Sequence, residues 1–299
     1  MPLVLFGSNN PTGAAFLDVC KIYPVEIWGR RPPSGLERIH TYCDLAEIPS
    51  KSIKPINGIL VSFAPIWLLA SFLTHYFKNK PDILQDLEGI IACSSSSFMT
   101  KRFAFNNHDK QLSLRLVNAH NEIQNICSKL NVPCQIIAPT MVYGKINDYS
   151  DKNLSKIIKI MRTLPFIILP KTTGFRQPIH AKQLATVASR QASLMQSGYW
   201  PSHTDRIMTI GGDSILTYKD MILQIQEQLD QKDHAKKCRI FTVPDRIFFL
   251  CVIALLPINP KVFEAIMRIC SNLSHFTKVH EILEEPPKRF PILPLATEY

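Results

Sequence analysis

The residues best placed for chemistry lie near the start of the chain, between Gly7 and Gly13. The apolar run Leu3–Phe6 predicts a buried strand of a parallel sheet, and this strand stops at Gly7. The apolar residues that begin at Ala14 predict a helix. A strand, a glycine-bounded turn and a helix start direct main-chain N–H groups toward one point, so the segment predicts a pyrophosphate site.

The glycine pattern of this turn is incomplete. Gly7 suits the tight turn and Gly13 suits a close approach of helix and strand, but Asn10 stands where a middle glycine is expected. Asparagine is the non-glycine residue that best tolerates positive φ, so we expect the turn to survive with less room for phosphate. The alternative interpretation is an ordinary strand-turn-helix.

Two arginines follow the next predicted strand, residues 25–28. In a dinucleotide-binding fold the end of this strand faces the adenosine ribose, where arginine suits a 2′-phosphate. Arg30 and Arg31 therefore favour NADP over NAD. The alternative is a pair of solvated arginines in a loop.

Composition describes a globular protein with an anionic partner. The chain has 299 residues, 46% of them hydrophobic, and a formal net charge of +10. Its eight cysteines include no C-x-x-C pair, and no charged and then apolar leader precedes the first strand, which predicts a reducing, cytoplasmic location. No nucleic-acid motif accompanies the charge, so we expect a phosphorylated ligand or a membrane surface and no nucleic acid.

Short apolar runs alternate with helical segments in the first half of the chain. Such alternation predicts a doubly wound parallel sheet covered on both faces, in which ligands gather at the carboxyl ends of the strands. Several candidate ligand-binding positions follow the predicted strand ends. They are the segment 7–13, Arg30, Asp44, Ala64, the serines 94–97 and the segment 139–144. The predicted strands are 3–6, 25–28, 39–43, 58–65, 89–93 and 134–138, and the predicted helices include 66–77 and 110–130.

The sequence resembles the extended short-chain dehydrogenase/reductase superfamily, in particular its nucleoside-diphosphate-sugar epimerase and dehydratase branch. The segments that carry this resemblance extend through nearly the whole chain. They are the loop that starts at Gly7, then Cys43-Asp44-Leu45, Ser94-Ser95-Ser96-Ser97-Phe98, Ala138-Pro139-Thr140-Met141-Val142-Tyr143-Gly144, Phe175-Arg176-Gln177-Pro178-Ile179-His180 and Gly211-Gly212-Asp213-Ser214.

The resemblance implies a Rossmann-type NAD(P)-binding domain, residues 1–146, to which 176–200 return. It implies a smaller discontinuous substrate part, residues 147–175 and 201–299. Asp44 and Leu45 are expected at the adenine, and Pro139 and Thr140 at the nicotinamide. The full expected cofactor set is Gly7, Ser8, Asn9, Asn10, Thr12, Gly13, Arg30, Arg31, Asp44, Leu45, Ala64, Pro65, Ser94, Pro139 and Thr140.

The catalytic helix departs from the family. The resemblance places Ser95 at the reacting hydroxyl of the sugar, with an uncertainty of one residue in register. The family also carries Tyr-x-x-x-Lys, but Leu114 and Asn118 occupy those stations, and no tyrosine lies between Tyr76 and Tyr143. Chemistry would therefore need another base, and the candidates are Lys101 and His120.

The remaining implied contacts are to substrate. The basic segment that includes Asn153 is expected to cover a nucleotide sugar, and Gln183 replaces an aspartate that is expected after His180. No metal site is predicted. The residues expected to contact substrate are Ser96, Tyr143, Asn153 and Arg176.

A C-terminal apolar run, residues 247–256, is too short to cross a bilayer as a helix. Together with the apolar positions of residues 262–269 it predicts either protein core or a face that rests on the inner surface of a membrane. The leading functional prediction is hydride transfer at a sugar carbon by a non-standard base. The alternatives are a catalytically inactive NAD(P)-binding scaffold and a peripheral enzyme that acts on polyprenyl-diphosphate-linked sugars; the oligomeric state is left open.

Overall fold

The structure is a computed structural model of the 299-residue chain. The structure describes residues 2–21, 24–33, 36, 39–47, 53–104, 106–200, 206–254 and 256–292. Leu255, in the apolar run discussed above, lies outside them.

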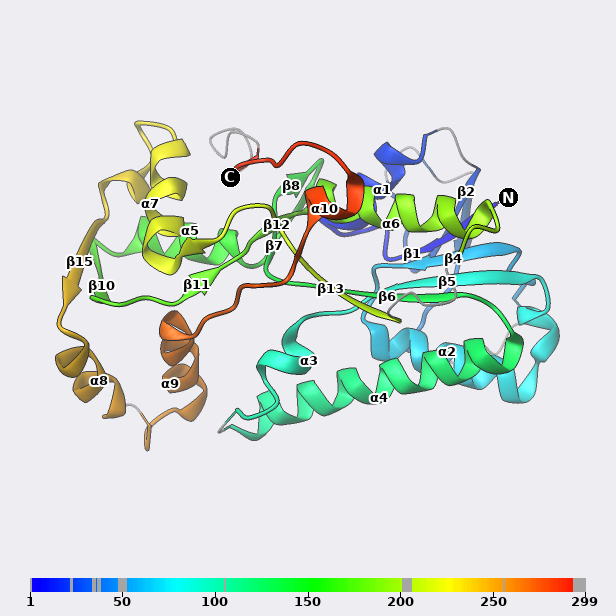
Figure 1. The fold of residues 1–299 in the computed structure, drawn as a ribbon, viewed down its shortest axis with the longest axis horizontal. Helices are drawn as coiled ribbons and strands as arrows, with labels where there is room; N and C mark the ends of the chain where they lie inside the picture. The colour runs from blue at the N-terminus through cyan, green and yellow to red at the C-terminus, as the bar shows by residue number, and fades with distance from the viewer. Residues whose placement is uncertain are drawn as a thin grey trace.

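The centre of the fold is an eight-stranded sheet in the order β16-β13-β6-β5-β4-β1-β2-β3, with every pair parallel (Figure 1). This confirms the predicted doubly wound α/β class. The chain leaves β1 toward β2 on one side and later returns to β4 on the other, so the turn after β1 lies where the strand order reverses. The strands are β1 (Leu3–Phe6), β2 (Val25–Gly29), β3 (His40–Tyr42), β4 (Gly58–Ser62), β5 (Leu87–Cys93), β6 (Cys134–Pro139), β13 (Ile207–Gly211) and β16 (Thr277–Lys278).

Side-chain alternation along β1 explains why both faces of the sheet are covered. Val4 and Phe6 point into one apolar core, which helices α2 (Ile66–Asn79) and α4 (Asn107–Leu130) close. Leu3 and Leu5 point into the other core, which α1 (Pro11–Val19) and α6 (Ala181–Gln196) close. In Figure 1 these two helix layers lie above and below the sheet.

A smaller part lies beside the sheet, at the left of Figure 1. Its own apolar core joins α5 (Leu154–Thr163) and α7 (Tyr218–Gln228) to the two-stranded sheet of β10 (Phe166–Pro170) and β15 (Arg239–Val243). A further cluster lies between α8 (Asp245–Ile253) and α9 (Pro260–Met267). Strands β13 and β16, within the range 201–299 expected for the substrate part, join the central sheet instead. The remaining strands and α-helices of the described residues are α3 (Ser97–Thr100), β7 (Val142–Tyr143), β8 (Lys145–Ile146), β9 (Tyr149–Ser150), β11 (Phe175–Arg176), β12 (Ile179–His180), β14 (Leu216–Thr217) and α10 (Val279–Leu283). Three short 3-10 helices complete them, η2 (Pro81–Leu84), η3 (His234–Lys237) and η4 (Arg268–Cys270).

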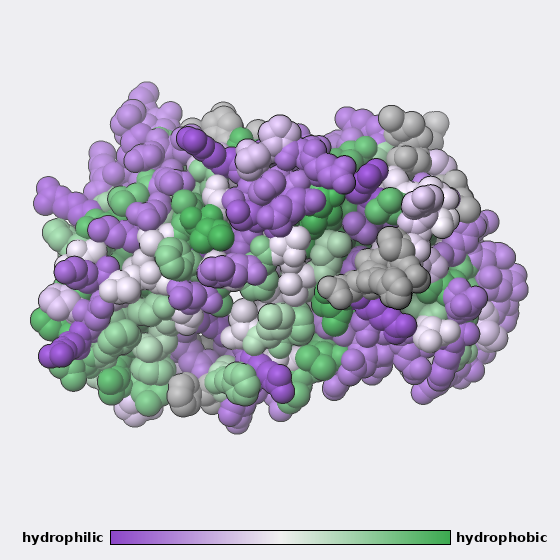
Figure 2. All heavy atoms as spheres, in the orientation of Figure 1, coloured by the Kyte–Doolittle hydropathy of each residue, from purple (hydrophilic) through white to green (hydrophobic). Residues whose placement is uncertain are grey.

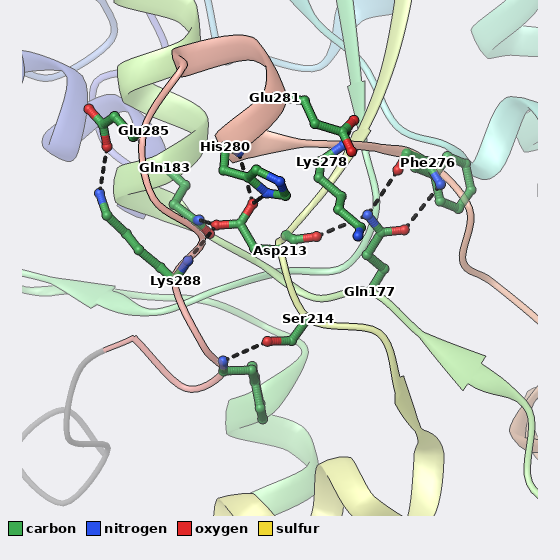
Figure 3. A network of polar contacts seen from close by, with 12 residues as sticks. Gln177, Gln183, Asp213, Ser214, Phe276, Lys278, His280, Glu281, Glu285 and Lys288 are labelled. Atoms are coloured by element: carbon green, nitrogen blue, oxygen red, sulfur yellow. Dashed lines mark hydrogen bonds and ion pairs between the residues drawn. The ribbon is translucent and has the colours of Figure 1, made fainter.

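A buried carboxylate connects the C-terminal segment to the sheet (Figure 3). Asp213 accepts hydrogen bonds from the main-chain N–H groups of His280 and Lys288, both at 2.9 Å, and from Gln183 Nε2 at 3.0 Å. Gln183 also caps α6 by accepting from the His180 N–H at 3.2 Å. The predicted departure at Gln183 therefore has a structural role at this joint.

Replacing Asp213 by alanine should lower the free energy of unfolding by about 3 kcal/mol, because buried donors lose a charged acceptor. Burial opposes ionisation, but the N–H groups of Lys288 and His280 lower the pKa of Asp213 below its usual value. The contribution of Asp213 is therefore present above about pH 4 and is lost as the pH falls further. Urea unfolding at pH 7 and at acid pH measures both effects, with exposed Asp230→Ala as the control; a loss under 1 kcal/mol would contradict this role.

Candidate functional site

The turn after β1 has the geometry that a close approach of helix and strand requires. Gly7 adopts φ +78, and a Cβ there would lie 2.5 Å from the Ala64 main-chain nitrogen. A Cβ on Gly13 would lie 2.1 Å from the Gly7 carbonyl oxygen. Both positions therefore need glycine, as the sequence predicted.

Asn10 behaves differently from the expectation. Its φ is −149, so the turn makes no use of a tolerance for positive φ. Its side-chain oxygen instead accepts from the N–H groups of Thr12 and Gly13, both at 3.0 Å, and its amide donates to the Gly7 carbonyl at 2.6 Å. The carboxamide thus caps α1 and occupies the helix N–H groups that a phosphate would otherwise bind.

A cavity of about 730 Å³ begins at this turn and extends along the ends of β1, β2 and β3. Asp44 and Arg30 lie in its wall, with Arg30 Nε 4.0 Å from Asp44 Oδ2, and the Asp44 carboxylate accepts from the Ala46 N–H at 2.9 Å. The cavity brings together most of the cofactor residues that the sequence predicted. These are Gly7, Ser8, Asn9, Asn10, Arg30, Arg31, Asp44, Leu45, Ala64 and Pro65.

A second cavity, of about 480 Å³, continues from the first, because Asn9, Asn10 and Phe63 line both. It lies over the ends of β5 and β6. The predicted residues in its wall, besides Asn9 and Asn10, are Thr12, Ser94, Pro139 and Asn153.

Tyr149, which the sequence analysis missed, lies in the wall of the second cavity. It belongs to the short β8–β9 hairpin, and its hydroxyl donates to the side-chain oxygen of Asn9 at 3.0 Å. The hairpin therefore reaches the loop after β1 from a segment 140 residues away. The tyrosine lies outside every motif of the resemblance, so nothing in the sequence pattern marked it.

Ser94 in the wall of the second cavity forms a pair with a buried histidine behind it. Ser94 Oγ lies 2.6 Å from Nε2 of His120, whose side chain is 1% exposed. Burial lowers the pKa of His120 to about 4, so the imidazole is neutral at pH 7. The Nδ1 atom has no hydrogen-bond partner among the described residues. The pair can accept a proton at Ser94 and pass the serine proton to His120.

The neighbouring serines Ser95 and Ser97 bond to each other. Ser95 Oγ donates to Ser97 Oγ at 3.0 Å and accepts from the Ser97 N–H at 3.2 Å, at the start of the short helix α3. The Ser96 N–H donates to the Pro139 carbonyl at 2.9 Å. The roles predicted for Ser95 and Ser96 stay predictions; of the three serines, it is Ser94 that lines the cavity.

On helix α4, the residues at the positions of the family's tyrosine and lysine cannot take over their roles. Leu114 is 55% exposed and Asn118 is also exposed on the helix surface. The helix directs His120 toward the end of β5 instead, where its ring packs edge-on against Phe98 at 5.0 Å.

The other candidate base, Lys101, lies in an ion-pair cluster. Its Nζ is 2.7 Å from Asp109 Oδ1, and Arg268 approaches Asp109 Oδ2 at 2.8 Å. Burial alone would raise the pKa of Asp109, but hydrogen bonds from Lys101 and Asn106 lower it to about 2. Asn106 also donates to Glu264 of α9, so the cluster joins the start of α4 to the smaller part.

Three further predicted residues serve the framework in this structure, and their contacts with ligand stay predictions. The Arg176 guanidinium donates to the Ser271 carbonyl at 2.6 Å, and burial lowers its pKa. The Tyr143 ring is 1% exposed, and its hydroxyl accepts from the Ile292 N–H at 3.1 Å. Thr140 Oγ1 donates to the Gln177 carbonyl at 2.5 Å.

The joined cavities fit a nicotinamide dinucleotide at the adenosine end. The space beside Asp44 and Arg30 suits an adenosine, and the Ser8, Asn9 and Asn10 N–H groups form no hydrogen bond within the described part of the chain. A diphosphate bound at this turn would rely on these loop groups, because Pro11 has no N–H and Asn10 caps the helix. Among the described residues no group of histidine, cysteine and carboxylate side chains could hold a metal ion.

Comparison with known proteins found the same fold in several solved structures. No protein-family model matches the sequence, and the search of curated proteins found no match. Among solved structures, MoeE5 in complex with UDP-glucose and NAD is 12% identical, with a TM-score of 0.62 over 100% of this chain and 97% of that chain. Human epimerase family protein SDR39U1 with NADPH is 10% identical, with a TM-score of 0.60 over 99% and 97%.

A third similar structure is the UDP-N-acetylglucosamine 4-epimerase from Methanobrevibacter ruminantium M1 in complex with UDP-N-acetylmuramic acid. It is 13% identical, with a TM-score of 0.56 over 96% of this chain and 93% of that chain. These similarities confirm the resemblance inferred from the sequence at the level of the fold.

Proposed function

We propose that this protein is a divergent short-chain dehydrogenase/reductase that binds NAD(P) and transfers hydride at a carbon of a nucleotide sugar. The observation that carries the proposal is the pair of joined cavities along the strand ends, with Ser94 and His120 at one end and Asp44 and Arg30 at the other. The structurally similar enzymes bind NAD or NADPH and sugar nucleotides, which supports the same ligand classes here.

In this mechanism the bound nicotinamide supplies the hydride acceptor. Ser94 accepts the proton of the substrate hydroxyl while its own proton moves to His120 Nε2, 2.6 Å away. Because the pKa of His120 is about 4, the imidazole is ready to accept a proton at neutral pH but is a weak base. We therefore expect slow turnover, with no histidine step in the rate profile between pH 6 and pH 8.

Replacing Ser94 by alanine should lower the rate of hydride transfer at least 100-fold, the usual scale for losing a proton-transfer group. Ser95→Ala is the matched control and should change the rate less than threefold, because Ser95 bonds to Ser97. Reduced-nicotinamide absorbance after mixing with UDP-sugars measures both variants. A larger loss in Ser95→Ala would assign the substrate contact to Ser95, as the resemblance implied.

The preference for NADP rests on Arg30 and Arg31, both in the wall of the larger cavity. The double variant Arg30→Ala/Arg31→Ala should weaken NADP⁺ binding roughly tenfold and NAD⁺ binding less than threefold, because only NADP⁺ has the 2′-phosphate. Calorimetric titration measures both affinities, with the exposed Arg190→Ala as the control. Equal losses for the two dinucleotides would contradict the preference.

A second candidate function is dinucleotide binding without catalysis. It is favoured by Leu114 and Asn118 at the stations of the tyrosine and lysine and by the ion pair that holds Lys101. A protein of this kind would bind dinucleotide, but its cofactor spectrum would not change with any nucleotide sugar.

A further inference from the structure

The small sheet of the substrate part presents an apolar face to solvent. In the parallel pair β10–β15, Phe166 lies opposite Arg239 and Ile168 lies opposite Phe241. All four side chains are exposed, whereas Leu169, on the opposite face of β10, is buried in the core under the sheet. A sheet face that is exposed to solvent normally carries polar residues. The three apolar side chains therefore indicate that another surface covers this face.

Helix α8 continues this apolar face. The chain turns from β15 directly into α8, whose Phe248 is buried against the α8–α9 cluster. Ile247, Leu250 and Ile253 on the same helix are 52%, 70% and 55% exposed. Ile258, in the turn before α9, is 77% exposed. Figure 2 shows the hydrophobic side chains gathered at the lower left, over β15, α8 and α9.

The charged residues between positions 236 and 262, the segment that contains β15 and α8, are almost all positive. The only acidic residue between positions 236 and 262, Asp245, accepts the Thr172 N–H at 2.9 Å. A cleft of about 660 Å³ borders the sheet face, with Phe166 and Phe241 in its wall beside Lys237 and Arg239. The basic residues between positions 236 and 262 are Lys236, Lys237, Arg239, Arg246 and Lys261, five against one acidic residue.

We propose that one face docks on an anionic lipid bilayer. It is formed by the exposed side chains of Phe166, Ile168, Arg239, Phe241, Arg246, Ile247, Leu250, Ile253 and Ile258. The aliphatic side chains of α8 enter the interface, and Arg239 and Lys237 bind lipid phosphates at its rim. No helix of the described residues has the length and hydropathy to cross a membrane. This docking is independent of the proposed dinucleotide chemistry.

Charge complementarity favours a bilayer over a second copy of the chain. A two-fold contact through this face would bring the basic residues of both copies to one interface, and like charges at an interface oppose association. An anionic surface neutralises Arg239 and Arg246 while it covers the apolar side chains.

Co-sedimentation of the full-length protein with vesicles tests the proposal. The protein should bind vesicles of phosphatidylcholine with phosphatidylglycerol at least tenfold more tightly than vesicles of phosphatidylcholine alone. The double variant Leu250→Glu/Ile253→Glu should lose at least tenfold of this binding, and Arg239→Ala/Arg246→Ala should lose the preference for anionic vesicles. Tyr199→Glu, at a residue 82% exposed after the end of α6, is the control and should bind as the unmodified protein does.

Circular dichroism and thermal unfolding must show that the variants are folded, and they should, because the changed side chains are exposed. Absence of binding to anionic vesicles, equal binding to both vesicle types, or unchanged binding in Leu250→Glu/Ile253→Glu would overturn the proposal. A dimer that Leu250→Glu/Ile253→Glu converts to a monomer would assign the face to a second copy and overturn it as well. Dinucleotide titration of the same samples reports the proposed function separately.

Discussion

His120 should lower the free energy of unfolding by about 3 kcal/mol as the pH falls from 6.5 to 4, and replacing His120 by glutamine should remove this loss. In the folded protein burial lowers the pKa of His120 to about 4, whereas the unfolded chain protonates near pH 6.5. Between these two values the unfolded state binds more protons than the folded state. The stability of the unmodified protein should therefore be complete above pH 6.5 and fall as the pH drops toward 4.

Glutamine has no titrating group, so in His120→Gln the unfolding free energy should be nearly constant across the same interval. Its amide can still bond to Ser94, which keeps the polar contact at the end of β5. Urea unfolding at closely spaced pH values measures the difference. His234→Gln, at an exposed histidine, serves as the control. A parallel pH dependence in His120→Gln and the unmodified protein would contradict a buried neutral imidazole.

Replacing Asn10 by glycine should tighten dinucleotide binding tenfold or more. The Asn10 carboxamide now accepts the N–H groups of Thr12 and Gly13, and its removal leaves both donors for a phosphate oxygen. Hydrogen bonds to a charged acceptor contribute about 1.5–3 kcal/mol each, while glycine as helix cap costs only a few tenths, so the balance favours the ligand.

The same variant should lose about 1–2 kcal/mol of stability, because the donor bonds of Asn10 to the carbonyls of Gly7 and Phe63 disappear. Asn10→Asp is the matched control, since it keeps a cap but places a negative charge beside the diphosphate, and it should bind more weakly than the unmodified protein. Calorimetric titration of the three proteins measures the order of affinity. If Asn10→Gly binds no tighter, the helix N–H groups of Thr12 and Gly13 take no part in phosphate binding.

The strands of the central sheet could be predicted because the sequence pattern that marks each strand is local. Runs such as Leu3–Phe6 are buried on both sides of a parallel sheet, so continuous apolar residues bounded by glycine mark them directly. The ligand positions followed from the rule that parallel strands present their carboxyl ends at one edge. In agreement with that rule, Gly7, Asp44 and Ser94 lie in the walls of the joined cavities.

The details of the site depended on side-chain direction, which spacing does not specify. The sequence placed the serine of the site at Ser95 with an uncertainty of one residue. In the structure Ser95 bonds to Ser97, whereas Ser94 faces the cavity and His120. Asn10 was expected to matter through its backbone, but it acts through its carboxamide. The ion pair between Lys101 and Asp109 and the reach of Tyr149 to Asn9 depend on tertiary contacts.

The apolar run of residues 247–256 illustrates an alternative that the sequence left open. Core and membrane interface need the same residue types, and only exposure distinguishes them. The structure divides the run, with Phe248 and Val252 buried and Leu250 and Ile253 exposed.

Titration of the full-length protein with NADP⁺ and NAD⁺, beside the variant Gly29→Phe, tests the central claim most directly. Gly29 lines the larger cavity, and a Cβ there would meet nothing within 4 Å, so a phenylalanine should fill the cavity without disturbing the fold. The account predicts saturable binding of one dinucleotide per chain, lost in Gly29→Phe with unchanged unfolding. Absence of binding by the unmodified protein, or equal binding by Gly29→Phe, would contradict a dinucleotide across the ends of these strands.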